Sequence, residues 1–393
     1  MNKKIVIIID ALRWDYISKK HTPFLYSFSK QNEYIKKLIP GPGFCERTEI
    51  FTGLDPFSSK MLLAYEFNNL KKNIKSFNLY ASVESILPSK LFLKIGKRNI
   101  TLKKIFRRII SNFFSERNFQ LIPFDFVPFF DLSEDKYEMA SNFFPHPNFF
   151  KNIETRGDKF SLNAFTGLNF KSLTDDQRIE LLTKELKDNK IKYHFLYIGQ
   201  IDFLGHKLGP ENLKKSKQIY KFDLKLKSLL NEIKTTHNTS EILIIGDHGM
   251  SEVSTCFNVE IKLNLFFKLN KLKRIKDYIY FLDSNYLRIW FHSNRESNKL
   301  KFKKFFNYKK QGDFLDDQKL NRLNGDSNKY GDIFWFAKEG VLIYPNFFNH
   351  TKQKGMHGYY NGSSDSFGLG IISSNKNSLK EELDLKHINS YLN

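Results

Sequence analysis

The sequence is poor in cysteine and in long apolar runs. Only two cysteines, Cys45 and Cys256, occur among 393 residues, which is too few for the disulfide framework of a small secreted domain. No stretch approaches the ~20 apolar residues that a membrane-spanning helix needs. The apolar run at residues 5–9 is shorter than the core of a secretory signal, and no small-residue cleavage site follows it. We therefore expect a soluble, cytoplasmic protein without a transmembrane segment.

The composition combines enough apolar residues for a core with a strongly basic balance of charge. Hydrophobic residues make up 41% of the chain, including 40 phenylalanines, which is enough for one large core and an inserted subdomain. The formal net charge is +21, and a basic surface attracts anions such as nucleotides, anionic glycans and acidic lipids. Because the lysines are scattered, biased composition explains this charge at least as well. Specific nucleic-acid binding is not expected, since no RNP, KH or paired-cysteine zinc motif is present.

Strand-like and helical patterns alternate along much of the chain. Residues 4–9 form a β-branched run that indicates a buried parallel strand with Asp10 at its carboxyl end. The later part of the chain alternates between helical patterns at residues 177–187 and 211–233 and strand-like runs at 193–198 and 241–245. Such alternation predicts an α/β fold with a doubly wound, mostly parallel sheet. In sheets of this kind, ligands bind at the carboxyl ends of the strands.

The pattern changes between residues 61 and 170. Basic and aromatic clusters dominate this segment, and it contains no spacing typical of catalytic side chains. We expect residues 1–60 and 171–393 to form the core, with residues 61–170 as an inserted cap over the site that helps to select the substrate. The aromatic clusters are also explained as the ordinary core of such an insertion.

Four segments place aspartate or histidine after strand-like runs or in glycine-flanked turns. The side chains with metal-ligand chemistry in these segments are Asp10, Asp202, His206, Asp247, His248 and His357. Mixed carboxylate and imidazole ligands suit zinc or a similar divalent ion. Two such ions ~3.5–4 Å apart can hold both the attacking and the leaving oxygen of a phosphoryl displacement. Each residue alone is a weak signal, but together they predict a site for two divalent ions, zinc or manganese, with zinc favoured.

Four short motifs resemble a known family. They are I-D-A-L-R-W-D at residues 9–15, D-x-x-G-H-x-x-G-P at 202–210, G-D-H-G-M at 246–250 and G-x-H-G at 355–358. In this order they resemble the type I phosphodiesterase/nucleotide pyrophosphatase family of the alkaline phosphatase superfamily. The resemblance implies an alkaline-phosphatase-like fold with an inserted cap.

The resemblance also implies a ligand set and a reaction. One ion would be held by Asp202, His206 and His357. The other would be held by Asp10, Asp247 and His248. The implied activity is metal-dependent hydrolysis of a phosphodiester, or of a nucleotide or sugar pyrophosphate bond. The partner would be an anionic, phosphate-containing small molecule or glycan.

Other functions remain open within and outside this reaction class. A phosphomonoesterase, a sulfatase-like enzyme or a phosphotransferase could use the same superfamily site. A sulfatase would carry a C-x-P-S-R pattern, which is absent around Cys45. A non-catalytic relative that retains the metal site is the alternative from a different class.

The nucleophile is the point where the resemblance fails. The family carries it at the start of a helix that ends in a T-G turn, which resembles residues 52–53 here. The usual spacing leads back to Gly43, which has no side chain. Three hypotheses follow: Cys45 attacks after a two-residue shortening, Thr48 reaches the metal ions, or a hydroxide bound to a metal ion attacks directly.

Arg47 lies in the same segment and has two interpretations. Its planar guanidinium could hold the non-bridging oxygens of a phosphate or sulfate group. Equally, it could be a helix-surface arginine that pairs with neighbouring glutamates or faces solvent.

Overall fold

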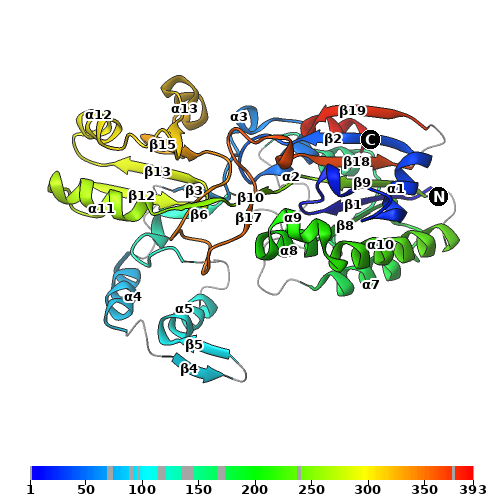
Figure 1. Cartoon of the computed structure of the whole chain (residues 1–393), viewed down its shortest axis with the longest axis horizontal. Helices are drawn as coiled ribbons and strands as arrows, with labels where there is room; N and C mark the ends of the chain where they lie inside the picture. The colour runs from blue at the N-terminus through cyan, green and yellow to red at the C-terminus, as the bar shows by residue number, and fades with distance from the viewer. Residues whose placement is uncertain are drawn as a thin grey trace.

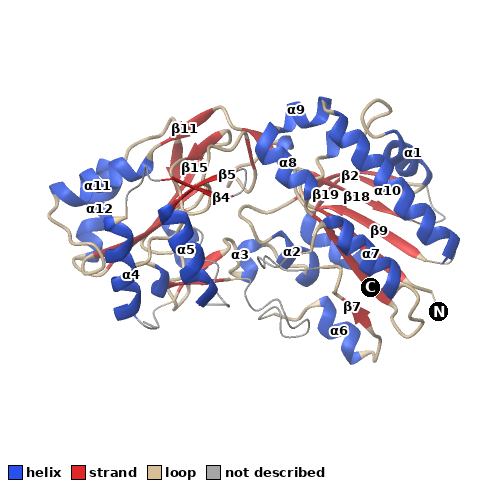
Figure 2. Cartoon of the chain, turned by 90° about the horizontal axis from the view of Figure 1, so that it is seen from below, coloured by secondary structure: helices blue, strands red, loops and turns tan. Residues whose placement is uncertain are grey.

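The computed structural model describes residues 2–68, 74–87, 92–95, 98–113, 121–133, 146–165, 173–236, 240–373 and 377–392. These residues form two lobes, which are visible in two views (Figures 1 and 2). One lobe contains the large sheet and both ends of the chain. The other contains a smaller sheet and the helices α11 to α13 (Figure 1).

The large sheet has seven strands and is mostly parallel. In spatial order its strands are β19 (Leu379–Asp384), β2 (Glu33–Ile39), β18 (Gly368–Ile372), β9 (Glu241–Gly246), β1 (Lys4–Ile9), β8 (Tyr193–Ile198) and β7 (Phe160–Ser161). Strand β1 pairs in parallel with β8 on one side and β9 on the other. Only β18 runs antiparallel to its neighbours β9 and β2. The predicted doubly wound, mostly parallel sheet is therefore confirmed.

Helices cover both faces of this sheet because the side chains of β1 alternate between them. Ile5, Ile7 and Ile9 pack on one face, while Val6 and Ile8 pack on the other. The first face is covered by α1 (Pro23–Gln31), α7 (Asp175–Glu185), α8 (Gln200–Leu208), α9 (Pro210–Lys215) and α10 (Lys217–Thr236). The second face is covered by α2 (Glu46–Thr52), α6 (Phe149–Thr155) and the 3-10 helix η5 (Leu385–Tyr391).

One predicted element is wrong in detail. The helical pattern at residues 211–233 forms two helices, α9 and α10, which are separated at Ser216. Ser216 is extended, with φ −82° and ψ 156°. Its hydroxyl donates to the Leu213 carbonyl at 2.7 Å and accepts from the Gln218 amide at 3.2 Å. A serine side chain that bonds local backbone in this way competes with the helical pattern, so the helix restarts after it.

The second lobe is built on a four-stranded antiparallel sheet. Its strands, in spatial order, are β12 (Tyr278–Leu282), β13 (Tyr286–Phe291), β15 (Ile333–Ala337) and β14 (Gly312–Phe314). Its helices are α11 (Val259–Leu269), α12 (Arg295–Phe305) and α13 (Asp317–Asn324). The described elements of the predicted cap that lie on this side are β3 (Tyr65–Phe67), α4 (Ile74–Ile86), β4 (Phe92–Ile95), β5 (Arg98–Thr101), α5 (Leu102–Phe113), η2 (Val127–Phe129) and β6 (Phe130–Leu132).

The two segments of this lobe share one core. Tyr65, Phe124 and Phe130 from the predicted cap belong to the same buried cluster as Trp290 and Trp335 from the smaller sheet. In contrast, α6 and β7 pack with the large sheet. The division into a core of residues 1–60 and 171–393 and a cap of residues 61–170 stays a prediction. The packing adds that side chains between residues 259 and 347 share the core of the predicted cap.

Seven short elements complete the described fold. They are η1 (Trp14–Tyr16), α3 (Pro56–Ser59), β10 (Ser251–Glu252), β11 (Thr255–Phe257), β16 (Val341–Ile343), β17 (Gly355–Met356) and η4 (Ser364–Ser366). Strand β10 pairs antiparallel with β17, and β11 pairs in parallel with β16. None of the helices in the described ranges combines the length and the apolar composition that crossing a membrane requires.

Candidate metal centre

The register of three parallel strands brings the predicted ligands together. Asp10 follows β1, and residues 247–248 follow β9 directly. Asp202 and His206 lie on α8, which begins two residues after the end of β8. Because β1, β8 and β9 are adjacent and parallel, their carboxyl ends meet at one edge of the sheet. The structure therefore places the sequence-predicted carboxylates and histidines in one buried region.

Asp202, His206 and His357 form the first group. One potential ligand atom of each lies within 4.8 Å of those of the other two. Asp202 and His206 are four residues apart on α8 and so share one face of the helix. The Nε2 atom of His206 lies 3.2 Å from Asp202 Oδ1, and that of His357 lies 3.6 Å from the same oxygen. These are the three residues that the resemblance assigns to one ion, and that assignment stays a prediction.

Asp10 and His248 form a second group, together with Asp202. The Nε2 atom of His248 lies 2.9 Å from Asp10 Oδ1 and 3.9 Å from Asp247 Oδ1. Asp247 Oδ1 instead accepts hydrogen bonds from the backbone amides of Ala11, at 3.2 Å, and His248, at 2.9 Å. Asp247 thus lies beside the second group but outside the ligand groups of the described residues.

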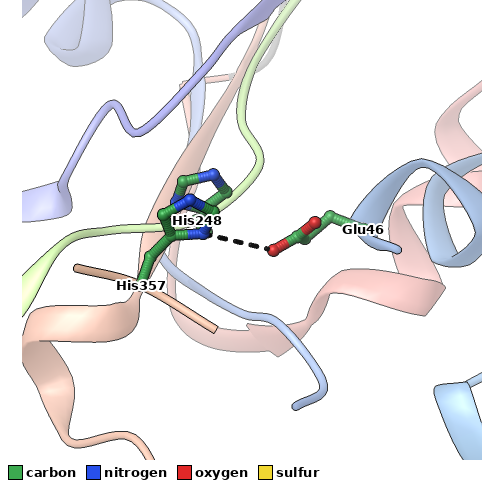
Figure 3. A group of neighbouring side chains, drawn as sticks. All are labelled: Glu46, His248 and His357. Carbon is green, nitrogen blue, oxygen red and sulfur yellow. Dashed lines mark ion pairs between the residues drawn. The ribbon is translucent and has the colours of Figure 1, made fainter. Parts of the chain in front are cut away.

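Glu46 is a potential ligand that the sequence did not reveal. It is the first residue of α2, and it forms a third group with His248 and His357. Its Oε1 atom lies 3.7 Å from His357 Nδ1, as the dashed line in Figure 3 marks. In the sequence, Glu46 stands out only as a neighbour of Cys45 and a possible partner of Arg47. Its place after a Gly-Pro loop, at the start of a helix, is the signal that could have drawn attention to it.

Backbone carbonyls orient two of the histidines. The Nδ1 atom of His206 lies 2.7 Å from the Gly355 carbonyl oxygen, and that of His248 lies 2.7 Å from the Gly249 carbonyl oxygen. A proton on each Nδ1 leaves Nε2 of the same ring as the acceptor that faces the carboxylates. The rings of His248 and His357 are stacked, with their centroids 3.8 Å apart. With the proton of a neutral ring on Nδ1, His206 and His248 would each direct a free Nε2 toward the carboxylates, as a metal ligand does.

Burial and crowding shift the pKa values of the carboxylates. Burial raises the pKa of Asp10 to about 7, and the charges of Asp202 and Asp247 add to this rise. Burial likewise raises the pKa of Glu46 to about 8, which the charge of His248 opposes. Although burial also disfavours the charge of Asp202, the nearby His206 holds the pKa of this carboxyl well below its usual value. The region therefore gathers carboxyl groups whose ionised forms a divalent cation would stabilise.

Buried polar atoms without partners test whether these residues fit a metal ion. Glu46 Oε1, Asp202 Oδ1 and His357 Nδ1 are buried and have no hydrogen-bond partner among the described residues. Such atoms are uncommon in folded proteins and call for an ion or another ligand. All three belong to residues of the ligand groups. The donor set thus fits one or more divalent ions.

At position 43, where the family pattern places the nucleophile, the structure leaves no room for a side chain. Gly43 has φ +100°, and a Cβ atom there would lie 1.9 Å from the Leu62 carbonyl oxygen. Its amide donates to the Gly358 carbonyl oxygen at 3.1 Å. No side chain fits at this position without a shift of the backbone, so the glycine follows from the path of the loop.

The other two candidates in this segment are buried. Cys45 is 2% exposed, belongs to an apolar cluster with Ile50 and Phe51, and is absent from the ligand groups of the described residues. Thr48 is fully buried, and its hydroxyl lies 3.7 Å from Met61 Sδ. The structure does not bring either side chain into the groups around His357. Their catalytic roles stay predictions, and burial argues against the role of Cys45.

Arg47 is not a helix-surface arginine. It is 9% exposed, and its guanidinium carbon lies 4.6 Å from the ring centre of Tyr197 and 5.2 Å from that of Phe165. Burial raises the pKa of Asp247, whereas the charges of His248 and Arg47 oppose this rise. The Tyr197 hydroxyl donates a hydrogen bond to Asp10. Arg47 is therefore held beside the carboxylates by aromatic faces, and its contact with substrate stays a prediction.

Solved structures share this fold over the whole chain. An inactive variant of murine ectonucleotide pyrophosphatase/phosphodiesterase 5 in complex with AMP has a TM-score of 0.68 and 16% identity, covering 100% of this chain and 94% of that chain. The human protein of the same name gives the same TM-score and the same coverage. At this identity the likeness concerns the fold, and it confirms the predicted fold class.

The family follows from the sequence. The model of the type I phosphodiesterase / nucleotide pyrophosphatase family matches residues 4–360, and the chain belongs to this family. Ectonucleotide pyrophosphatase/phosphodiesterase family member 7 of Rattus norvegicus is 27% identical over 108 residues, 26% of this chain and 25% of that protein. Venom phosphodiesterase CdcPDE of Crotalus durissus collilineatus is 33% identical over 101 residues, 24% of this chain and 12% of that protein. The matched segments thus span a quarter or less of these relatives.

Proposed function

We propose that this chain is a metal-dependent hydrolase that cleaves a phosphodiester, or a nucleotide or sugar pyrophosphate bond. The observation that carries the proposal is the convergence of Asp10, Asp202, His206, His248 and His357 at one sheet edge, with buried ligand atoms that lack partners. Membership of the type I phosphodiesterase family supports this reaction class.

The protein's own groups have distinct parts in this reaction. The chemistry expected of two divalent ions at such residues is polarisation of phosphoryl oxygens and stabilisation of the charge that develops in the displacement. His206 and His248 would bind through Nε2, because their Nδ1 atoms face backbone carbonyls. Arg47 would offset negative charge beside Asp247, held in place by the Tyr197 and Phe165 rings.

Zinc is the metal ion that the donor set favours. Three imidazoles combined with carboxylates match the usual ligands of zinc in two-metal hydrolases, whereas manganese prefers more oxygen ligands. The net charge of +21 supports an anionic substrate, a phosphate-containing small molecule or glycan. AMP in the murine relative supports a substrate that contains a nucleotide.

The test compares substrates and metal ions on the purified full chain. Protein treated with a chelator is reloaded with Zn²⁺ or Mn²⁺ and assayed on bis-p-nitrophenyl phosphate, p-nitrophenyl phosphate and p-nitrophenyl sulfate. We expect chelation to abolish hydrolysis, Zn²⁺ to restore it, and the diester to be cleaved fastest. Faster cleavage of the monoester or the sulfate would favour the phosphomonoesterase or sulfatase-like alternative. No cleavage by the metal-loaded protein would favour a non-catalytic relative.

We also propose that the protein is located in the cytoplasm. Cys256 is exposed on β11 while Cys45 is buried, and the two form no disulfide with each other. Exposed thiols are most common in proteins of reducing compartments. Cell fractionation with a specific antibody tests this location, and recovery of the protein from the periplasm or the medium would contradict it.

A further inference from the structure

The carboxylate of Glu46 enters the candidate metal centre from the side of α2 and faces the stacked rings of His248 and His357 (Figure 3). Glu46 is 8% exposed, so its side chain is withdrawn from solvent. The Oε1 atom is buried and has no hydrogen-bond partner among the described residues. A buried carboxylate oxygen without a donor is costly, so this atom calls for a cation.

The distance between Glu46 and His357 fits two ligands of one ion. Glu46 Oε1 and His357 Nδ1 lie 3.7 Å apart, which is too long for a hydrogen bond. Both atoms are buried without a partner in the described part of the chain. Zinc–ligand distances of ~2.0–2.1 Å place two tetrahedral ligand atoms roughly 3.4 Å apart. The observed separation is therefore close to that of two atoms that face a shared ion.

Neighbouring basic side chains do not neutralise Glu46. Within the described residues, its one ion-pair contact within 4.0 Å is with His357. Arg47, the next residue, points instead at the rings of Tyr197 and Phe165. Glu46 is thus left facing two imidazoles, an arrangement typical of a metal site rather than of a structural ion pair.

The position of Glu46 in the chain adds a second argument. Residue 43, where the family spacing would place a nucleophile, cannot carry a side chain because the Leu62 carbonyl fills that space. Three residues later, Glu46 brings the one ligand-type side chain of described residues 43–52 that joins a metal-ligand group. Glu46 therefore supplies an oxygen to this region in a segment that lacks the usual hydroxyl.

We propose that Glu46 is a ligand of a divalent metal ion and binds it together with His248 and His357. The inference rests on the proposed metal centre, and it adds a ligand that the family resemblance does not assign. His357 Nδ1 faces Glu46 and its Nε2 faces Asp202, and because a neutral imidazole has one free lone pair, His357 binds through one of these nitrogens and keeps its ring proton on the other. Glu46 thus extends the centre toward α2.

The chain offers a matched control on the same helix. Glu49 lies three residues after Glu46 and is 3% exposed, so it is also a buried glutamate. Its Oε1 atom accepts a hydrogen bond from the Gly41 amide at 2.8 Å, and Glu49 is absent from the metal-ligand groups of the described residues. A Glu49→Gln variant replaces a buried carboxyl group near the same place without removing a proposed ligand.

The experiment measures metal binding rather than turnover. The wild-type chain, Glu46→Gln, Glu46→Asp and Glu49→Gln are stripped of metal and titrated with Zn²⁺ by calorimetry, and the Co²⁺-loaded proteins are compared by visible absorption. We expect Glu46→Gln to weaken one binding event at least ~10-fold and to change the Co²⁺ spectrum, since even the loss of an outer-shell partner has an effect of this size. Glu49→Gln should bind as the wild type does, and Glu46→Asp should be intermediate. Equal affinity and an identical spectrum in Glu46→Gln would overturn the inference.

A second measurement does not depend on the folding of variants. Anomalous diffraction from crystals of the zinc-loaded wild type locates each ion. An ion ~2.0–2.2 Å from a Glu46 oxygen supports the proposal, and an ion beyond bonding distance of both oxygens refutes it. The diester assay separates this result from the proposed function. A wild type that binds zinc through Glu46 but cleaves no phosphate ester would contradict the function and leave the metal site standing.

Discussion

The imidazole of His206 is tied to the strand that leads to His357. Its Nδ1 atom lies 2.7 Å from the carbonyl oxygen of Gly355, two residues before His357. Lys354 reinforces this link, because its amide donates to the His206 carbonyl oxygen at 2.8 Å. Two histidines that are 151 positions apart in sequence are thereby placed against the same carboxylate, Asp202.

The first prediction concerns the ligands themselves. We expect His206→Ala and Asp247→Ala to lower the bound metal content and to reduce diester hydrolysis at least ~100-fold, since metal-assisted displacement needs the complete centre. Elemental analysis and the diester assay measure the two effects. His387→Ala is the control, because this exposed histidine lies on η5, away from the ligand groups. Unchanged metal content and activity in both ligand variants would mean that the site is elsewhere.

A second prediction concerns the hydrogen bonds by which residues of the second lobe anchor the loop that carries His357. The side-chain amide of Asn285 donates to the His357 carbonyl oxygen at 2.9 Å, and the Tyr286 hydroxyl donates to that of Gly358. We expect Asn285→Ala to weaken zinc binding ~10-fold, because the loop that carries His357 loses an anchor. Calorimetric titration measures this effect. Asn349→Ala, which removes a bond to Ser284 instead, should bind zinc as the wild type does. Equal zinc affinity in Asn285→Ala and the wild type would show that this anchor is dispensable.

The third prediction addresses the nucleophile. Because Cys45 is 2% exposed within an apolar cluster, we expect Cys45→Ala to retain diester hydrolysis within ~3-fold of the wild type. Thr48→Val should also retain activity, since the Thr48 hydroxyl is buried against Met61. Loss of activity in Cys45→Ala with partial recovery in Cys45→Ser would instead identify Cys45 as the attacking group. Loss in Thr48→Val alone, in a folded protein, would identify Thr48.

A fourth prediction links pH to stability through Asp283. Burial raises the pKa of this carboxyl to about 7, although the charge of Arg288 opposes the rise. Between about pH 4 and pH 7 the folded state therefore keeps a proton that the unfolded state has released. The free energy of unfolding attributable to Asp283 should thus fall as the pH rises through this window, by on the order of 3–4 kcal/mol.

Chemical denaturation of the metal-free protein at pH 5 and pH 7.5 checks this prediction. The difference between the two pH values should be smaller in Asp283→Asn, which cannot titrate. Asp313→Asn, an exposed aspartate on β14 at the opposite edge of the sheet from β12, serves as the control and should keep the wild-type difference. An Asp283→Asn variant with an unchanged difference would show that Asp283 titrates normally.

The sequence by itself determined the three adjacent parallel strands β9, β1 and β8 of the large sheet and most of the candidate ligand residues. The apolar runs of β1, β8 and β9 are continuous because these strands are buried on both faces, so they stand out without tertiary information. The residues that follow such strands lie at the ligand-binding edge by topology alone. For this reason Asp10 and residues 247–248 could be found from local pattern, and the motif around Asp202 from its spacing on one helical turn.

Only the tertiary structure decided the role of the segment before α2 and the make-up of the second lobe. The loop at residues 40–45 packs against the Leu62 carbonyl, which accepts a hydrogen bond from the Phe44 amide, and Glu46 follows this loop near His357. No local sequence pattern encodes the proximity of these positions. Likewise, residues 65 and 335 share a core because two distant segments both need to bury aromatic side chains. Local periodicity identifies the faces that must be buried, and the folded chain alone determines which of them meet.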